Sequence, residues 1–312
     1  MEWDGTPYHS LNWEIRKQFG KKLYKISLDG GMTCPNRDGT VGYGGCIFCS
    51  EGGSGDFAAD RELSVKEQLK TAKERIRDKL PKGKPGRYIA YFQAFTNTYA
   101  PAARLETLFT EAMEDEEVEV LSIATRPDCL PDGVLELLGK LNQRKPVWIE
   151  LGLQTASEKT AGWIRRGYPL SCFTEARQHL GALGIPVIAH VIIGLPGEGE
   201  AGLLKTIDYL NEQAVEGVKL QLLHILKGTG LEELYRTGEV RALSFEEYET
   251  LLFAAIRRLR PETVIHRITG DGPKRLLIAP LWSGNKKMVL NTLHRDMKML
   301  GIRQGMDFKR RY

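Results

Sequence analysis

The chain has 312 residues, of which 42% are apolar and 27% charged, which is ordinary for a globular protein that buries a large core. No run of 18 apolar residues is present, so we expect no transmembrane helix and no membrane contact. The N-terminal segment starts with acidic residues and lacks the apolar stretch of a signal peptide, which predicts a cytoplasmic protein. The net charge of +4 neither requires nor excludes a nucleic-acid partner.

Six apolar segments rich in β-branched residues predict buried strands, and amphipathic segments between them predict helices. The predicted strands are 23–28, 88–93, 118–125, 147–153, 186–194 and 218–225. Clear helical patterns occupy 64–80, 130–143 and 173–184, and the last of these ends on Gly184 just before Pro186. Such an alternation of strands and helices is typical of a wound parallel sheet or a partial barrel.

Unusual polar residues follow each predicted strand. The first strand is followed by three cysteines, the second by QAFTNTY, the third by TRPD, and the last three by Gln154, GLPGE and HILKGT. Because the carboxyl ends of parallel strands share one edge, we expect these residues to line one site. Beyond residue 230 we expect helices at 231–240 and 244–259, a final strand and loop within 263–277, and a basic helix at 285–300.

Three of the five cysteines lie in the glycine-rich stretch CPNRDGTVGYGGCIFC, residues 34–49. A disulfide is disfavoured in a reducing cytosol, and an odd count leaves one cysteine unpaired. A structural zinc site normally has two close pairs of ligands, whereas only Cys46 and Cys49 form a close pair here. Three thiolates in a pliable loop favour a four-iron cluster with one iron that has no protein ligand. Zinc and a redox-active dithiol stay open from the spacing alone.

Three longer segments carry a resemblance that extends over essentially the whole chain: LNWEIRKQFG, SLDGGMTCPNRDGTVGYGGCIFCS and WSGNKKMVLNTL. They resemble radical S-adenosylmethionine (radical SAM) enzymes, in particular the small bacterial YtqA/YhcC-like family, which is related to the radical SAM half of the Elongator catalytic subunit. The resemblance implies an α/β fold, a partial (β/α)6 TIM-type barrel of the radical SAM kind with a C-terminal helical and basic extension. We expect a leader at 1–20 packed on the barrel, a core barrel at 21–230, and a substrate-binding extension at 231–312 that does not fold independently.

The resemblance also implies two cofactors, a [4Fe–4S] cluster and S-adenosylmethionine (SAM). Cys34, Cys46 and Cys49 would ligate the cluster, whose fourth iron would chelate SAM. The residues that would contact SAM are Gln93, Thr96, Gln154, Arg166, His190 and Gly194. Gln93 and Thr96 would replace the glycine-rich turn that the family usually carries after the second strand. Arg166 would pair with the SAM carboxylate, because a guanidinium can bind both carboxylate oxygens.

Four residues are candidates for a catalytic role: Glu150, His190, His224 and Lys227. Each also has a structural interpretation. Glu150 could be a buried hydrogen-bond acceptor, His190 and His224 could be core histidines, and Lys227 could cap a loop. In the same way Arg126 and Asp128 could pair with each other and cap the next helix. Cys129 and Cys172 are expected to be buried thiols without a second cluster.

The resemblance implies that a reduced cluster cleaves SAM to methionine and a 5′-deoxyadenosyl radical, which abstracts a substrate hydrogen. An electron donor such as flavodoxin or ferredoxin would reduce the cluster. By analogy with Elongator, the substrate would be the C5 side chain of wobble uridine 34 in tRNA, with a carboxymethylaminomethyl group processed towards aminomethyl. Two alternatives stay open: a radical SAM enzyme that acts on a small metabolite, like the coproporphyrinogen-oxidising relatives, and a non-catalytic iron–sulfur or RNA-binding protein.

Basic residues gather near both ends of the chain. The N-terminal set is Arg16, Lys17, Lys21, Lys22 and Lys25, and the C-terminal set is Lys286, Lys287, Arg295, Lys298, Arg303, Lys309, Arg310 and Arg311. If both sets flank the barrel mouth, they form a surface that follows nucleic-acid phosphates. The alternative interpretation is a solvated charged face.

Overall fold

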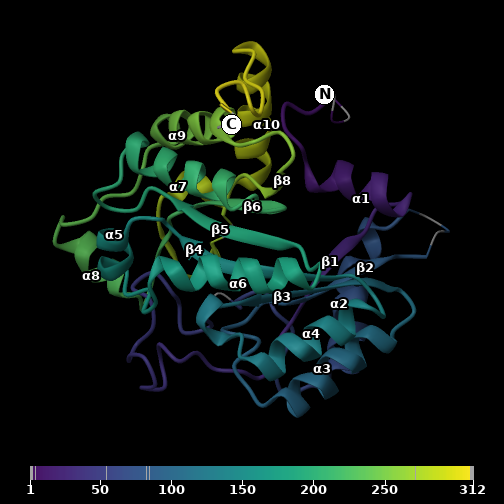
Figure 1. Cartoon of the computed structure of the whole chain (residues 1–312). Helices are drawn as coiled ribbons and strands as arrows, with labels where there is room; N and C mark the ends of the chain where they lie inside the picture. The colour runs from purple at the N-terminus through teal and green to yellow at the C-terminus, as the bar shows by residue number, and fades with distance from the viewer. Residues whose placement is uncertain are drawn as a thin grey trace.

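The computed structural model describes residues 3, 5–53, 55–81, 83, 85–270 and 272–309 (Figure 1). Seven of its strands form one parallel sheet, in the order β1-β2-β3-β4-β5-β6-β8, which curls into a half-barrel. They are β1 (Tyr24–Leu28), β2 (Tyr88–Phe92), β3 (Val118–Thr125), β4 (Val147–Gln154), β5 (Val187–Ile193), β6 (Gly217–Leu222) and β8 (Val264–Arg267). Two short strands, β7 (Ile225–Leu226) and β9 (Leu277–Ala279), pair antiparallel beside it.

The predicted α/β half-barrel is confirmed, and all six predicted strands form with small changes at their ends. The structure adds β8, which lies in the segment assigned to the C-terminal extension but hydrogen-bonds to β6. The strand–helix alternation did not reveal β8 as a barrel strand, because it has four residues and follows two consecutive helices. The sheet therefore continues one strand beyond the predicted (β/α)6 unit.

Helices cover the outer face of the sheet (Figure 1). They are α2 (Val65–Ile76), α3 (Ala102–Glu114), α4 (Asp132–Asn142), α6 (Leu170–Ala182), α7 (Glu200–Glu212) and α9 (Phe245–Arg258). The other helical segments are α1 (Leu11–Phe19), α5 (Glu158–Trp163), α8 (Gly230–Arg236), α10 (Lys286–Met299) and the short 3-10 helices η1 (Arg77–Lys79), η2 (Pro127–Cys129) and η3 (Leu281–Gly284). In the described part of the chain, none is long and apolar enough to span a bilayer.

Side chains alternate between the two faces of each strand, and the two faces differ in chemistry. The outward set, which includes Ile26, Phe92 and Ile149, packs under the helices and forms the main hydrophobic core. The inward set is polar at the middle of the barrel, where Lys25, Glu150 and other hydrophilic side chains face one another. The concave face is therefore built to hold polar groups.

An apolar layer closes the amino-terminal end of the half-barrel. Ile15 of α1 packs there against a cluster drawn from the beginnings of the strands: Leu23, Ile89, Val120, Trp148 and Ile188. The helix begins at Ser10, whose side chain accepts a hydrogen bond from the Trp13 amide, and it ends at Gly20 with a φ of 67°. Consequently α1 lies at the amino-terminal end of the barrel, opposite the cysteine loop that follows β1.

Candidate functional site

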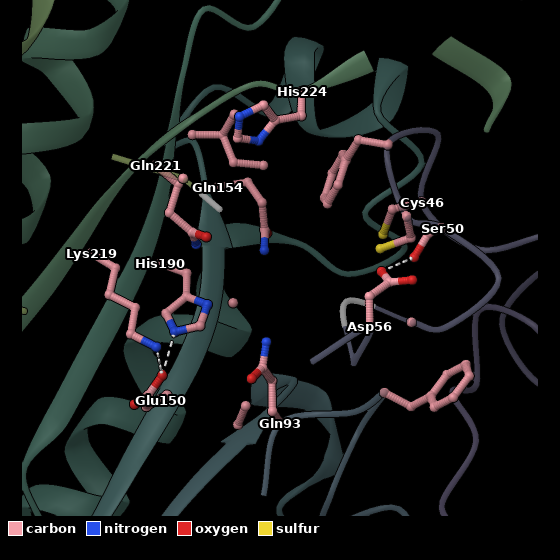
Figure 2. A pocket seen from close by; sticks show the side chains of 18 of the residues that line it. Cys46, Ser50, Asp56, Gln93, Glu150, Gln154, His190, Lys219, Gln221 and His224 are labelled. Carbon is pink, nitrogen blue, oxygen red and sulfur yellow. Dashed lines mark hydrogen bonds and ion pairs between the residues drawn. The ribbon is translucent and has the colours of Figure 1, made fainter. Parts of the chain in front are cut away.

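A cavity of about 600 Å³ lies between the cysteine loop and the inner face of the half-barrel, and all seven strands of the sheet contribute to its lining. Nine of the residues predicted from sequence line it: Cys34, Cys46, Cys49, Gln93, Thr96, Glu150, Gln154, His190 and His224. The other three, Arg166, Gly194 and Lys227, do not belong to the lining. Figure 2 shows side chains from several strands converging on this space.

The loop that carries the three cysteines is held by its own polar contacts. The Cys34 carbonyl accepts a hydrogen bond from the Arg37 amide at 2.8 Å. The Asn36 side-chain amide donates to the Cys46 sulfur at 3.5 Å and to the Arg165 carbonyl at 2.5 Å. Gly45 has a φ of 80°, and a Cβ there would lie 2.9 Å from the Arg37 Nε. Glycine is therefore required at this turn.

The donor set of this loop fits a [4Fe–4S] cluster. All five cysteines are described and none forms a disulfide. A hydrogen bond from Cys49 and another from Asn36, helped by nearby arginines, lower the pKa of Cys46 to about 7 despite burial. The thiolate, which is the form that binds iron, is therefore accessible near neutral pH.

The number of thiols bears on the kind of metal centre. A structural zinc site normally has four cysteine or histidine ligands. In a [4Fe–4S] cluster each of three thiolates can bind a different iron and leave the fourth iron without a protein ligand. The three cysteines of this loop match that ligand number.

Gln154 is held in a strained backbone conformation at the end of β4. Its φ is 62°, which is uncommon for a residue other than glycine and costs about 1–3 kcal/mol. The Tyr168 hydroxyl donates to the Gly152 carbonyl at 2.7 Å and lies 3.3 Å from the Gln154 Oε1. The side-chain nitrogen of Gln154 consequently points into the cavity (Figure 2).

Arg166 stands behind this turn rather than in the cavity. Its guanidinium donates to the carbonyls of Leu153, Thr155 and Tyr168 at 2.7–3.1 Å and to the Glu158 carboxylate at 3.1 Å. The side chain is 1% exposed. Its Nη1 thus holds the carbonyls on either side of Gln154, while Nε and Nη2 bond Tyr168 and Glu158. The pairing of Arg166 with the SAM carboxylate stays a prediction.

Gly194 and Lys227 also lie away from the cavity. Gly194 has a φ of 94°, and a Cβ there would lie 2.8 Å from a methyl group of Leu243, so the residue shapes the turn after β5. The Lys227 side chain is exposed, and its amide donates to the Leu276 carbonyl at 2.8 Å. Lys227 could have pointed into the site or capped the loop. In the structure its side chain lies on the surface of the loop.

His224 lies at the rim of the cavity. Its Nε2 is 3.1 Å from the Ser283 hydroxyl oxygen of η3, and a Cβ on Gly270 would lie 2.5 Å from its ring. On the opposite side, Asp56 accepts a hydrogen bond from Ser50 at 2.8 Å and pairs with Arg275 at 3.3 Å. Asp56 thereby ties the cysteine loop to the segment that precedes β9.

Arg126 and Asp128 pair with each other, as the structural interpretation held. The Arg126 Nε and Nη2 donate to the two carboxylate oxygens at 2.9 and 2.7 Å. The pair does not remove Arg126 from the site, because the arginine also lines the cavity and lies 4.8 Å from the Tyr168 ring centroid.

Glu150 is the centre of a buried polar network on the floor of the cavity (Figure 2). Its carboxylate is fully buried and accepts hydrogen bonds from Lys25 at 2.6 Å and from Ser122 at 2.9 Å. It also bonds to Lys219 and lies 2.8 Å from the His190 Nε2. Lys219 in addition donates to the Tyr91 hydroxyl at 3.2 Å.

The charges of this network follow from its burial. Burial alone would raise the pKa of Glu150, but the ammonium groups of Lys219 and Lys25 outweigh it and hold that pKa well below the usual range. Burial, reinforced by Lys219, lowers the pKa of His190 to about 4. At neutral pH the glutamate is therefore ionised and the histidine neutral. An ionised carboxylate only accepts, so His190 donates through Nε2 and presents Nδ1 to the cavity as an acceptor.

Sequence reasoning missed several members of the inner face, among them Lys219, Ser122 and Gln221. The signal was present as single polar residues at alternate positions inside apolar strands, for example Lys219 and Gln221 in VKLQL. Gln221 and Gln93 face the same space as Gln154, and Gln93 is oriented by a hydrogen bond of 2.9 Å from Ser27 (Figure 2).

The two terminal basic sets do not both flank the mouth. Lys25 points inside the barrel, and the remaining N-terminal residues of the set lie on or just after α1, at the opposite end. In the C-terminal set, Lys286 and Lys287 begin α10 next to η3, whose Ser283 contacts His224 at the rim. The chain beyond α10 turns towards the N-terminal segment, where Gln304 accepts from the His9 amide at 2.8 Å. Arg310 and Arg311 lie outside the described residues.

A half-barrel with a three-cysteine loop over the carboxyl ends of its strands is typical of one class of enzyme, and comparison with known proteins identifies that class. Residues 34–210 match the Radical SAM superfamily, and residues 215–299 match the Radical_SAM C-terminal domain. The chain is 45% identical to the uncharacterized protein YtqA of Bacillus subtilis over 97% of this chain and 93% of that protein. It is 37% identical to the protein YhcC of Escherichia coli, over 93% of this chain and 92% of that protein.

The chain therefore belongs to the radical SAM superfamily and, within it, to the family of YtqA and YhcC. It is a radical SAM enzyme whose cofactors are a [4Fe–4S] cluster and SAM.

More distant similarity connects the chain with Elongator. It is 30% identical to Elongator complex protein 3 of Schizosaccharomyces pombe over 61% of this chain, which spans 35% of that longer protein. The structure of the archaeal Methanocaldococcus infernus Elp3 superposes with a TM-score of 0.67 at 18% identity, covering 90% of this chain and 64% of that one. At this identity the superposition shows a shared fold.

Proposed function

We propose that this radical SAM enzyme modifies the C5 side chain of wobble uridine 34 in tRNA, with a carboxymethylaminomethyl group processed towards aminomethyl. The observation that carries the proposal is the charge of the cavity. Six lysine and arginine side chains line it against two carboxylates: Lys25, Arg37, Lys79, Arg126, Lys219 and Arg267 against Asp56 and Glu150. Such a lining attracts an anionic substrate. The similarity to Elongator complex protein 3 supports the choice of tRNA, since the family resemblance implies a wobble-uridine substrate.

In this proposal Cys34, Cys46 and Cys49 hold the cluster at the top of the cavity. When bound, the cluster and SAM supply one-electron reductive cleavage of SAM, which yields a 5′-deoxyadenosyl radical. Flavodoxin or ferredoxin is the proposed electron donor, and the cytoplasm the proposed location.

The residues of the chain would bind and orient the two reactants. Gln93, Thr96, Gln154 and His190 line the cavity and are proposed to contact SAM, while Gly194 and Arg166 shape the turns behind them. The Nδ1 of His190 can accept a hydrogen bond from a hydroxyl or N–H group. The amide nitrogens of Gln93 and Gln154 can donate to carbonyl oxygens (Figure 2).

Phosphates of the tRNA would be held at the rim rather than by the N-terminal basic set. Lys274 and Arg275 are exposed and lie beside Pro273, which lines the cavity. Phosphate contacts of this kind position a nucleic acid without reading its sequence. Binding should therefore weaken with added salt.

The test is an inventory by mass spectrometry of tRNA nucleosides from cells that lack this protein. The same cells are complemented with wild type, with Cys46→Ala or with Cys172→Ala. Cys172 lies outside the cavity lining and serves as the matched control. We expect 5-carboxymethylaminomethyluridine to accumulate in the deletion, and wild type and Cys172→Ala to clear it while Cys46→Ala does not.

Identical inventories in the deletion and the wild type would remove tRNA as the substrate. The radical SAM site would stand, and small metabolites would then be screened for stimulation of 5′-deoxyadenosine release.

A further inference from the structure

The floor of the cavity carries more positive than negative charge. Lys25 and Lys219 both bond to Glu150, and Arg267 lines the cavity next to them on β8. Within the lining at this level Glu150 supplies the one carboxylate, because Asp56 lies at the rim. Buried charges are stable when they are balanced, so an excess of cations on an enclosed polar floor is suited to an incoming anion.

The two lysines are arranged around one aromatic ring. The Lys25 nitrogen lies 4.3 Å and the Lys219 nitrogen 4.5 Å from the ring centroid of Tyr91, whose hydroxyl is 3.2 Å from Lys219. Lys25 keeps 24% of its side chain exposed, and His190 keeps 18%. The floor is thus reachable from the cavity, while the apolar layer that contains Trp148 and Ile188 closes it from below.

We propose that this floor is a subsite for a carboxylate of the substrate, bound by the ammonium groups of Lys25 and Lys219 with the Tyr91 hydroxyl beside them. Which group of the substrate supplies this carboxylate depends on the proposed function. In that function it is the carboxymethyl end of the uridine side chain. Glu150 holds both ammonium groups in place and leaves donor N–H groups on each, since an ammonium has three.

The floor lies deep in the barrel, where a substituent of the base can reach but a phosphate of the tRNA backbone cannot. We therefore expect it to bind a carboxylate rather than a phosphate. Three glutamine side chains, Gln93, Gln154 and Gln221, line the cavity nearer the carboxyl ends of their strands than Tyr91, Glu150 and Lys219 of the floor. Their amides suit the carbonyl edge of a pyrimidine. A base at that level would direct its C5 substituent downwards, while the phosphates stay with the tRNA backbone at the rim.

Carboxylate binding should be coupled to a proton. Burial lowers the pKa of Lys219 to about 7. The charged and titratable groups around it are Lys25 from β1, Tyr91 from β2, Glu150 from β4, His190 from β5, and His266 and Arg267 from β8. An added carboxylate would favour the ammonium form and raise that pKa. Binding above pH 7 is therefore expected to take up a proton.

The experiment is isothermal titration of the cluster-reconstituted, SAM-loaded enzyme under anaerobic conditions at pH 8, in two buffers of different ionisation enthalpy. The probes are 5-carboxymethylaminomethyluridine, its neutral primary amide, glutarate and inorganic phosphate. The variants are Lys219→Met and Lys25→Met. Lys21→Met, which removes an exposed lysine paired with Glu119, is the control.

We expect the acid to bind at least ten-fold more tightly than the amide, with proton uptake, and glutarate to compete with it. Lys219→Met should reduce the affinity for the acid to that for the amide and abolish proton uptake, and Lys21→Met should change neither. Should Lys219→Met not fold, Lys25→Met, at a partly exposed position, is expected to give the same loss of discrimination.

Other outcomes separate the subsite from the proposed function. Equal binding of acid and amide would overturn the carboxylate subsite and leave uridine as the substrate. If neither nucleoside binds but glutarate does so in a Lys219-dependent way, the subsite stands and the uridine assignment fails. Phosphate that binds as tightly as glutarate would overturn the selection of a carboxylate, and binding of none of the probes would overturn both proposals.

Discussion

Replacing Lys219 by methionine should change how the stability of the protein depends on pH. Lys219 is buried in the barrel, and burial lowers its pKa from the ordinary 10.5 to about 7. This lowering of the pKa corresponds to a free energy on the order of 5 kcal/mol. This free energy opposes folding below pH 7, where Lys219 is charged in both the folded and the unfolded protein. It vanishes above pH 10.5, where Lys219 is neutral in both.

The sign of the pH dependence follows from proton counting. Between pH 7 and 10.5 the unfolded chain holds a proton on Lys219 that the folded protein lacks. The free energy of unfolding should then rise with pH by about 1.4 kcal/mol per unit from this residue alone. Lys219→Met removes the titrating group, so the variant should lose this slope.

The assay is urea unfolding of the cluster-free, reduced protein at pH 7.5, 8.5 and 9.5, for wild type, Lys219→Met and Lys21→Met. Over these two pH units wild type should gain about 3 kcal/mol relative to Lys219→Met, and Lys21→Met should follow wild type. Parallel curves for wild type and Lys219→Met would refute the assignment of a lowered pKa to Lys219.

Three further substitutions test the site. Cys46→Ala should lower iron content and the visible absorbance of the reconstituted protein, whereas Cys172→Ala should leave both unchanged. Arg166→Lys should destabilise the protein by about 3 kcal/mol in thermal unfolding, because one ammonium cannot serve three carbonyls and a carboxylate. Gly45→Ala should cost about 1–2 kcal/mol and reduce cluster uptake, since its φ is 80°. Gly133→Ala, in open space on α4, should instead be neutral or stabilising by up to about 1 kcal/mol.

Local sequence was sufficient to predict the frame of this protein. The apolar β-branched segments and the helices between them indicated six of the seven barrel strands, because burial on a parallel sheet demands such runs. The common edge of those strands also predicted that Cys34, Gln93 and Gln154 lie around one site, and all three line the cavity. The short strand β8 was predicted as a strand of the C-terminal extension and not as part of the barrel, since four residues after two helices do not continue the strand–helix alternation.

The role of each buried polar residue was decided by the tertiary structure. Arg166 is predicted from the family resemblance to contact SAM, yet its guanidinium donates to three carbonyls and a carboxylate of this chain. Lys25 belongs by sequence to a basic terminal set, yet it points into the barrel towards Glu150.

The physical reason is that alternation along a strand determines which face a side chain occupies, whereas its partners come from other strands. Lys25, Glu150 and Lys219 are far apart in the chain, and only the curling of the sheet brings their charges together on one floor. Their charge states depend in turn on that proximity and on exclusion of water. The sequence thus determined the barrel and the edge at which its site lies, and the closed tertiary structure decided which residues line the site and what charge they carry there.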